Sequence, residues 1–482
     1  MSVAESQSGV NEPAGLAEAL TLQRRAQLRE GPPDAATRIG RLTRAIAILV
    51  SHADAFAEAL AADFGHRSRD QTMLTDIAGA IASLKYARAH LKAWMRPDRR
   101  AVEFPLGLLG ARAEVRHEPK GVVGIISPWN FPVRLAFSPL AGALAAGNRV
   151  MIKPSELTPA TSGLMARLVG EAFDRSEVAV CPGGPDVAAA FSRLPFDHLL
   201  FTGSTTVGRK VMSAAAENLV PVTLELGGKS PAILGRGADL ARAASSIGLG
   251  KMLNAGQICL APDYVLAPRE AVRPFVAALG DAVAAMFPTL KDNPDYTSVI
   301  DARHHERLKG YVAEARARGR EIVEINPGKE DFSQQPARKM PLTLILEPDD
   351  DLAVMREEIF GPVLPVKAYS TIEEAIAFVA ARDRPLALYY FGPDAAEREQ
   401  VLGHTASGGA CVNETLLHES MDDLPFGGIG ASGMGAYHGP EGFRTFSHAR
   451  AVFHQARIDA TALLRPPFGE RYRKLVGLRI KK

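Results

Sequence analysis

The chain has 482 residues, of which 46% are hydrophobic and 23% charged. These proportions indicate a globular protein of two or three domains and exclude a largely disordered chain. Lys and Arg number 56 against 54 Asp and Glu, a net charge of +2. This balance lacks the basic surplus of a nucleic-acid-binding protein, so we expect a small-molecule partner and no nucleic acid.

Three cysteines, Cys181, Cys259 and Cys411, lie far apart, without a CxxC pair or a histidine at metal-ligand spacing. We therefore expect reduced thiols, no metal and a cytoplasmic location. Residues 1–20 carry neither a basic leader nor an apolar run, and no uncharged stretch has the length of a bilayer span, so a secreted or transmembrane protein is not expected. The basic tail at 465–482 predicts a solvated or partner-packed end, with contact to a membrane as the alternative.

The first predicted element is an amphipathic helix over residues 36–65. Apolar residues from Ile39 to Leu49 recur at helical spacing, and the run ends at Gly65. From residue 121 the period changes, and buried strands alternate with helices. The expected strands, in chain order, are GVVGIIS, RVMIKP, EVAVCP, HLLFTGS and PVTLEL.

Four helices separate these five strands, and one of them opens with Thr158 as N-cap and Pro159 at its first position. Strands separated by helices pair in parallel with right-handed crossovers. The fold class is therefore α/β, with a doubly wound, Rossmann-like parallel sheet whose ligands collect beyond the carboxyl ends of the strands.

A second α/β region begins near residue 227. Its expected strands are SPAIL, CLAPDYVLAP, GPVLPVKAY, LALYYFG and GGACVN, with helices between several of them. Residues 325–339 are polar and predict a surface loop. Two further segments, 111–120 and 449–458, alternate in polarity and predict edge strands outside both sheets.

The segment FTGSTTVG (201–208) places Gly203, Ser204 and Gly208 at a predicted strand-to-helix junction. Small residues there let backbone N–H groups and the helix N-terminus approach a phosphate. A tight turn also requires glycine for backbone reasons, so this segment alone leaves both interpretations open.

The segment MIKPSE (151–156) adds a cation and a carboxylate, Lys153 and Glu156, after a neighbouring strand. Each charge alone is typical of a solvated loop. Together with the 201–208 junction, however, they lie where a dinucleotide belongs in this architecture.

Glu225 ends an apolar strand, where a carboxylate is costly unless it has a partner or a raised pKa. That setting suits a general base, and an ion pair with Lys229 is the structural alternative. Asn130 follows another strand, and its side-chain amide either donates to an oxyanion or caps a turn.

Cys259 lies in the segment NAGQICLAPD, and a free cysteine is commonly a small buried apolar side chain. Glu358 and Phe360 lie in EEIFGPV, where turn chemistry and a core phenylalanine are the ordinary interpretation. Taken in order with the preceding motifs, these segments resemble the aldehyde dehydrogenase superfamily from about residue 35 to 455. NAGQICLAPDY, LPFGGIGASGMGAYHG and FRTFSHAR are most similar to its class 3 branch, and RKMPLTLILEPDDD and RPLALYYF to the coniferyl aldehyde dehydrogenases.

This resemblance implies NAD(P)-dependent oxidation of an aldehyde to a carboxylic acid. Cys259 would attack the carbonyl carbon, the Asn130 amide and the Cys259 backbone N–H would hold the oxyanion, and Glu225 would activate water to release the acid. One departure is Ile258, where many relatives carry Thr. A helix N-terminus or a nearby cation would lower the pKa of the thiol.

The same resemblance implies the cofactor contacts. Lys153 and Glu156 would hold the adenosine ribose, and the 201–208 junction would lie near the pyrophosphate. Glu358 and Phe360 would position the nicotinamide ribose and ring. Glu156 favours NAD because a carboxylate repels a 2′-phosphate, with NADP as a second possibility.

The implied organisation is an NAD(P)-binding domain (1–103 and 121–226), a catalytic domain (227–421), oligomerisation strands (104–120 and 449–458) and a C-terminal tail (459–482). Those strands would bridge subunits, which predicts a homodimer.

An aromatic or medium-chain aldehyde is expected because Trp129, Phe131, Tyr264 and His418 are candidates to line an apolar tunnel, although core packing explains aromatic residues equally well. The resemblance to the coniferyl aldehyde dehydrogenases favours coniferyl aldehyde as the expected substrate, and a broad fatty or aromatic aldehyde dehydrogenase is the alternative. A cysteine-dependent ester hydrolase and a non-catalytic scaffold are the rivals from other classes. The hydrolase would have no use for the nucleotide-like loops.

Overall fold

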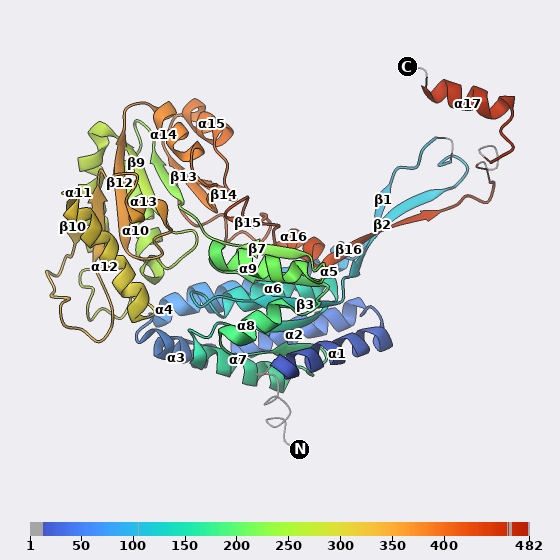
Figure 1. Cartoon of the computed structure of the whole chain (residues 1–482), viewed down its shortest axis with the longest axis horizontal. Coiled ribbons are helices and arrows are strands. Elements are labelled where there is room, and N and C mark those ends of the chain that lie inside the picture. The colour runs from blue at the N-terminus through green and yellow to red at the C-terminus, as the bar shows by residue number, and fades with distance from the viewer. Residues whose placement is uncertain (1–12, 105, 460, 462–464, 481–482) are drawn as a thin grey trace.

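The computed structural model describes residues 13–104, 106–459, 461 and 465–480, which form two large sheets and a projecting arm (Figure 1). The beginning of the chain, on which the expectation of no leader depends, lies largely outside these residues. Among the described residues, no single helix is long and apolar enough to cross a bilayer, and one bent helix pair passes that test by length and composition.

The first sheet contains six strands, five of them parallel. In spatial order they are β15 (Gly433–Met434), β7 (Val222–Glu225), β6 (His198–Thr202), β3 (Val122–Ile126), β4 (Arg149–Lys153) and β5 (Val178–Val180). The connecting helices are α6 (Arg134–Ala146), α7 (Pro159–Ala172), α8 (Pro185–Ser192) and α9 (Thr205–Ala216). The five predicted strands and four helices are confirmed. The prediction missed β15, which pairs antiparallel with β7 and is only two residues long.

Helices from the beginning of the described chain pack beside this sheet. They are α1 (Pro13–Glu30), α2 (Ala35–Ser51), α3 (Ala53–Phe64), α4 (Arg69–Thr72) and α5 (Gly79–Trp94), with a π-helical segment, Met73–Ala78, between the last two. The prediction of one helix over 36–65 is wrong, because His52 leaves the helical region at φ −126° and α2 and α3 meet at 66°. Gly65 ends α3 as predicted, with a left-handed φ of +75° that suits glycine.

The start of α7 differs from its predicted capping. The Thr158 side chain accepts no capping hydrogen bond. Instead, the carboxylate of Asp63 on α3 accepts the backbone N–H groups of Ala160 and Thr161, each at 2.9 Å. A side chain distant in sequence therefore satisfies the free N–H groups of α7, which a local pattern does not reveal.

The second sheet contains seven strands. In spatial order they are β10 (Glu321–Ile325), β11 (Leu342–Leu346), β12 (Val363–Tyr369), β9 (Tyr264–Pro268), β8 (Pro231–Leu234), β13 (Ala387–Phe391) and β14 (Gly409–Val412). Only β10 is antiparallel to its neighbour. The predicted strands are confirmed, although residues 259–263 form a turn rather than the start of β9, and β10 and β11 were not predicted.

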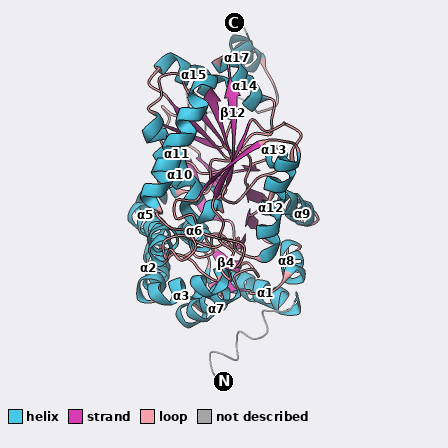
Figure 2. Cartoon of the chain, turned by 90° about the vertical axis from the view of Figure 1, so that its left-hand side faces the viewer, coloured by secondary structure: helices cyan, strands magenta, loops and turns pink. Residues whose placement is uncertain are grey.

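Helices cover both faces of the second sheet. They are α10 (Leu240–Met252), α11 (Val272–Met286), α12 (Ala302–Ala317), α13 (Ala353–Arg356), α14 (Ile372–Ala380) and α15 (Ala395–His404). Figure 2 shows α10 and α11 on one side of β12, and α12 and α13 on the other. The polar loop predicted at 325–339 is confirmed between β10 and β11.

A three-stranded antiparallel sheet forms the arm that projects from the body (Figure 1). Its strands are β1 (Asp98–Arg100), β2 (Arg112–Pro119) and β16 (Ser447–His454), so both predicted outer strands are present and pair with each other. β1 belongs to the arm although it precedes residue 104. Helix α16 (Gly439–Thr445) leads into β16, and α17 (Glu470–Ile480) lies beyond the arm with no buried residue.

Candidate active site

The segment that carries Cys259 is an irregular turn and not the continuation of a helix. After α10, Asn254, Ala255 and Gly256 all take left-handed φ values, 49°, 53° and 71°. Such values are costly for Asn and Ala, so the surroundings must hold them in place. A Cβ at Gly256 would lie 2.6 Å from the carbonyl oxygen of Gly361, which shows how closely this turn approaches the EEIFGPV segment.

Gln257 holds this turn from within. Its Nε2 donates to the carbonyl oxygens of Asn254 and Ser298 at 2.9 and 3.0 Å, and its Oε1 accepts the Ile300 N–H at 2.9 Å. All three groups are buried, where hydrogen bonds are strong and their loss is costly. The thiol two residues later is therefore carried by a rigid backbone.

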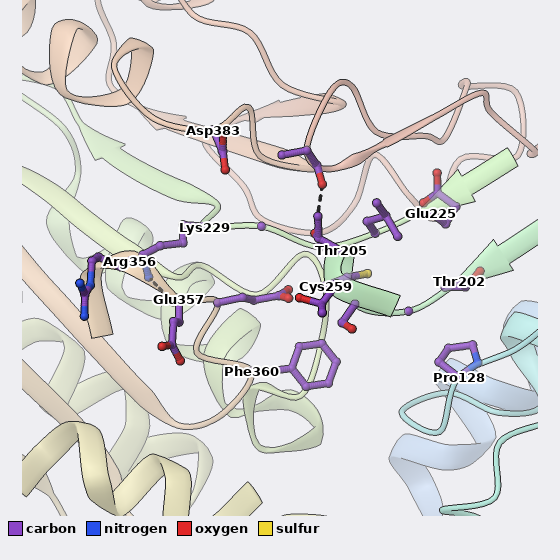
Figure 3. A pocket seen from close by; sticks show the side chains of 18 of the residues that line it. Pro128, Thr202, Thr205, Glu225, Lys229, Cys259, Arg356, Glu357, Phe360 and Asp383 are labelled. Carbon is purple, nitrogen blue, oxygen red and sulfur yellow. Dashed lines mark hydrogen bonds between the residues drawn. The ribbon is translucent and has the colours of Figure 1, made fainter. Parts of the chain in front are cut away.

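A cavity of about 1110 Å³ lies between the two large sheets, at the carboxyl ends of the strands of the first. Figure 3 shows Glu225, Cys259 and Phe360 around it. Seven of the predicted site residues line this cavity. They are Asn130, Gly203, Ser204, Glu225, Cys259, Glu358 and Phe360.

Three predicted cofactor residues do not line the cavity. Lys153 ends β4, is buried, and donates to Glu156 Oε2 at 3.2 Å, so these two residues form an ion pair at the same edge of the sheet. Gly208 lies inside α9, where a Cβ would meet the Leu226 side chain at 2.7 Å. Glycine at this position allows α9 to pack closely, while Gly203 and Ser204 face the cavity.

Glu225 is almost fully buried at the end of β7, and its Oε1 has no hydrogen-bond partner. Burial raises its pKa well above the ordinary value, opposed by a hydrogen bond from the Gly428 backbone. The alternative pairing with Lys229 is wrong, because Lys229 forms its ion pair with Asp263. In its ionised form the Glu225 carboxylate is therefore a stronger base than an ordinary glutamate.

The Cys259 thiol is half-buried, and its pKa lies well above the ordinary value. Burial is the largest cause, followed by the negative charges of Glu225 and Glu358. The sequence predicts that a helix N-terminus or a nearby cation would lower the pKa of this thiol. Neither is the dominant influence on it here. A cationic group bound in the cavity would shift the balance toward the thiolate.

Asn130 is held by an ion pair that the sequence analysis missed. Arg67 Nη1 donates to the Asn130 carbonyl oxygen at 2.6 Å, and Arg67 Nη2 donates to Asp76 Oδ2 at 2.6 Å. Asp76 Oδ1 in turn accepts the backbone N–H groups of Val133 and Arg134 at 3.2 and 3.3 Å. This buried pair fixes the loop between β3 and α6.

The Asn130 amide directly contacts the turn that carries Cys259. Its Nδ2 donates to the Gln257 carbonyl oxygen at 3.1 Å. The same carbonyl accepts Asn254 Nδ2 at 3.2 Å. The second hydrogen of the Asn130 amide is the one available to an oxyanion formed beside Cys259.

The segment with Glu358 and Phe360 is also held by residues that the motifs did not reveal. Asp263 Oδ1 accepts the Ile359 N–H at 3.0 Å, and Arg307 donates to the carbonyl oxygens of Glu358 and Ile359. Phe360 takes a positive φ of 50°. Charged side chains from the turn before β9 and from α12 therefore place both residues, and a one-dimensional pattern offers no signal for such contacts.

Burial raises the pKa of Glu358 to about 8, and its Oε1 has no hydrogen-bond partner. A Cβ at Gly227 would overlap this carboxyl group, so the glycine is required for the close approach. A buried oxygen without a partner is costly, and the hydroxyl groups of a ribose would satisfy it.

Of the four aromatic residues expected around a substrate tunnel, Trp129 alone lines the cavity. Its ring lies 5.3 Å from that of Phe360 in an edge-on arrangement. The prediction for Tyr264 is wrong, because its side chain is buried in the core below α14. Phe131 packs under the Arg67 guanidinium, and His418 lies beside Cys411, with Nδ1 3.0 Å from the sulfur.

A doubly wound sheet with a deep cavity at its carboxyl edge defines a nucleotide-binding α/β protein. Residues 16–452 match the model of the aldehyde dehydrogenase family. The chain is 59% identical to the probable coniferyl aldehyde dehydrogenase of Caulobacter vibrioides, covering 96% of each chain. It is 53% identical to the coniferyl aldehyde dehydrogenase of Pseudomonas sp. strain HR199, again with 96% coverage of each.

Solved structures agree with this result. The substrate-bound AldH of Staphylococcus aureus superposes with a TM-score of 0.90 at 36% identity, over 96% of this chain and 99% of that one. An aldehyde dehydrogenase of Mycobacterium tuberculosis complexed with NAD+ gives 0.80 at 30% identity, over 91% and 90%. The chain belongs to the aldehyde dehydrogenase family, and it is an NAD(P)-dependent aldehyde dehydrogenase.

Proposed function

We propose that this enzyme oxidises coniferyl aldehyde to the corresponding carboxylic acid, with NAD+ as the preferred cofactor. The observation that carries the chemistry is the convergence of a thiol, a buried carboxyl and an amide, from Cys259, Glu225 and Asn130, on one cavity. Support for the substrate comes from relatives more than 50% identical that are named for coniferyl aldehyde.

In this proposal, the Cys259 thiolate attacks the aldehyde carbon and forms a thiohemiacetal. The oxyanion accepts hydrogen bonds from the free hydrogen of the Asn130 amide and from the Cys259 N–H. Loss of hydride converts the adduct to a thioester. Glu225 then removes a proton from the water that attacks the thioester, and the acid leaves while Cys259 is restored.

The residues around the cavity fit NAD+, which supplies a hydride acceptor when bound. The start of α9 offers backbone N–H groups to a pyrophosphate beside Gly203 and Ser204. The free Oε1 of Glu358 would accept ribose hydroxyl groups, and the Phe360 ring would lie against the nicotinamide. Lys153 and Glu156 would hold the adenosine ribose at the neighbouring strand end, with Glu156 disfavouring a 2′-phosphate.

We also propose that the arm joins two copies into a homodimer, and that the enzyme works in the cytoplasm with its three cysteines as free thiols. The domain limits given by the sequence are part of this proposal. Support comes from the two large sheets, whose strands other than β15 fall within 121–226 and 227–421, respectively.

The test is cofactor reduction at 340 nm with coniferyl aldehyde, benzaldehyde, hexanal, decanal and succinic semialdehyde, each with NAD+ and with NADP+. The highest kcat/KM is expected for coniferyl aldehyde with NAD+. A preference for hexanal or decanal would replace the substrate with a broad or fatty aldehyde. Ester hydrolysis without reduction of either cofactor would favour the cysteine hydrolase.

A further inference from the structure

A second group of polar side chains lies near Cys259 but outside the lining of the cofactor cavity. It consists of Arg134 at the start of α6, Glu419, Tyr437 and His438. The charge of Glu419 acts on the pKa of both Cys259 and Glu225, and the Tyr437 hydroxyl is influenced by Glu225, Glu419, Arg134 and Cys259. The Arg134 backbone N–H belongs to the loop that holds Asn130, and the next residue, Leu135, lines the same cavity as Cys259, so this polar group lies near the thiol.

An ion pair stands at the centre of the group. Arg134 Nη2 lies 2.8 Å from Glu419 Oε1, and both side chains remain 15% exposed. Arg134 Nη1 also donates to the Thr75 carbonyl oxygen at 3.4 Å. A Cβ at Gly79 would lie 2.6 Å from Arg134 Nη1, so glycine at that position leaves the space that the guanidinium occupies.

Several buried polar atoms in this group have no hydrogen-bond partner. They are Arg134 Nε, the Tyr437 hydroxyl and both ring nitrogens of His438, while Tyr437 and His438 are only 2% and 3% exposed. Each such atom costs free energy unless water or a ligand satisfies it. These atoms cluster beside one partly exposed ion pair. Such a cluster indicates a binding site for a polar part of a ligand.

Exposed apolar side chains lie on the loop that carries Glu419. Residues 416–424 pack against α5, through hydrogen bonds from Ser83 to Asp422 at 2.9 Å and from Tyr86 to Asp423 at 2.7 Å. Three large apolar side chains of this loop, Leu417, Met421 and Leu424, are exposed, and so is Leu74 in the π-helical segment. These side chains offer apolar surface close in sequence to the polar group.

We propose that Arg134, Glu419 and Tyr437 bind the phenolic hydroxyl group of an aromatic aldehyde. The Glu419 carboxylate accepts the phenol O–H, while Arg134 Nε and the Tyr437 hydroxyl donate to the oxygens at that end of the ring. An extended cinnamyl aldehyde has its phenol oxygen and its aldehyde carbon at opposite ends, so its aldehyde can point toward Cys259 while its phenol meets this group. This inference rests on the proposed function and identifies how the site selects within it.

The experiment compares kcat/KM for coniferyl aldehyde, cinnamaldehyde, which lacks ring substituents, and 3,4-dimethoxycinnamaldehyde, which lacks the phenol O–H. A substitution that changes the reactivity of the Cys259 thiol or of the hydrolytic water changes kcat/KM for all three aldehydes alike. Such effects therefore cancel when the kcat/KM values of two aldehydes are divided. In wild type, coniferyl aldehyde is expected to exceed both analogues about tenfold or more, since a buried polar site rejects a substrate that leaves it unpaired. In Glu419→Leu this ratio should fall toward one.

Tyr437→Phe removes a single hydroxyl group and should reduce the same ratio by a smaller factor. Glu171→Gln is the matched control, because its ion pair with Arg167 on α7 is exposed and makes no contact with this group. Its ratios should equal those of wild type.

The two failures are distinct. A wild-type enzyme that oxidises hexanal but not coniferyl aldehyde would overturn the proposed function. A wild-type enzyme that prefers coniferyl aldehyde, with the same preference in Glu419→Leu and Tyr437→Phe, would overturn only the present inference. In that case water molecules, rather than the substrate, satisfy these polar atoms.

Discussion

The Cys259 thiol lies among carboxyl groups, and Glu225, Glu358 and Glu419 all raise its pKa. Replacement of Glu358 by Gln removes one of these charges. In the cofactor-free enzyme, we expect Glu358→Gln to react with iodoacetamide about threefold to tenfold faster near pH 9, where Glu358, with a pKa of about 8, is mostly ionised, because a decrease of one pKa unit in the thiol gives up to tenfold more thiolate. Reaction of Cys259→Ala measures the contribution of the other two cysteines. Slower alkylation in Glu358→Gln would show that the carboxyl groups do not control the thiol.

The pH dependence of turnover follows from the same two residues. The pKa of Glu225 is raised, so its carboxyl group is protonated at low pH and cannot accept a proton from water. The Cys259 thiolate also increases with pH. We expect kcat to rise steadily from about pH 6 to about pH 9, well above the range of an ordinary glutamate. A kcat that reaches its plateau below pH 6 would contradict the assigned environments.

At the scale of secondary-structure elements, the Arg67–Asp76 pair joins the turn before α4 and the π-helical segment to the loop before α6. Both side chains are almost fully buried. We expect Asp76→Ala to lower the free energy of unfolding by about 3–5 kcal/mol, because the Arg67 charge is left buried without its partner. It should also lower kcat, since Asn130 loses its support. Chemical denaturation checks the first effect, with Asp70→Ala on the exposed face of α4 as the control.

Local patterns predicted most elements of both large sheets because these strands are continuously apolar and helices of ordinary length separate them. The break at His52 was missed because apolar spacing continues across it. The strands β10 and β11 were missed for different reasons. β10 is a partly exposed edge strand, and β11 follows a long polar loop. The capping of α7 by Asp63 depends on a tertiary contact, which local sequence does not encode.

In the candidate site, too, local sequence predicts some residues, whereas others depend on tertiary contacts. Cys259, Glu225 and Asn130 were predictable because each ends or follows a buried segment and matches a family motif. Arg67 and Asp76 hold the Asn130 loop, and Asp263 and Arg307 hold the segment of Glu358 and Phe360. These four residues come from other parts of the chain, and in the sequence their charges resemble ordinary surface charges. The prediction for Tyr264 was wrong because closeness in sequence to Cys259 does not fix the direction of a side chain. Tyr264 begins β9, and its side chain points into the core beside α14.

At the scale of the whole molecule, the arm extends β2 and β16 away from the body, and β16 forms an edge of its sheet. An exposed edge strand with apolar side chains is a surface suited to pairing with another chain. Phe453 on β16 is 53% exposed. We expect light scattering to give twice the chain mass of 51.5 kDa for wild type and a single-chain mass for Phe453→Asp. A monomeric wild type would contradict the proposed dimer.

The covalent role of Cys259 is the central claim, and peptide mass spectrometry tests it most directly. Glu225→Gln is mixed with coniferyl aldehyde and NAD+, quenched in acid and digested. We predict one equivalent of reduced cofactor and a matching acyl group on the peptide that contains Cys259, because hydride loss occurs while hydrolysis is slow. Formation of reduced cofactor with no acyl group, or with an acyl group on Cys181 or Cys411, would contradict the account.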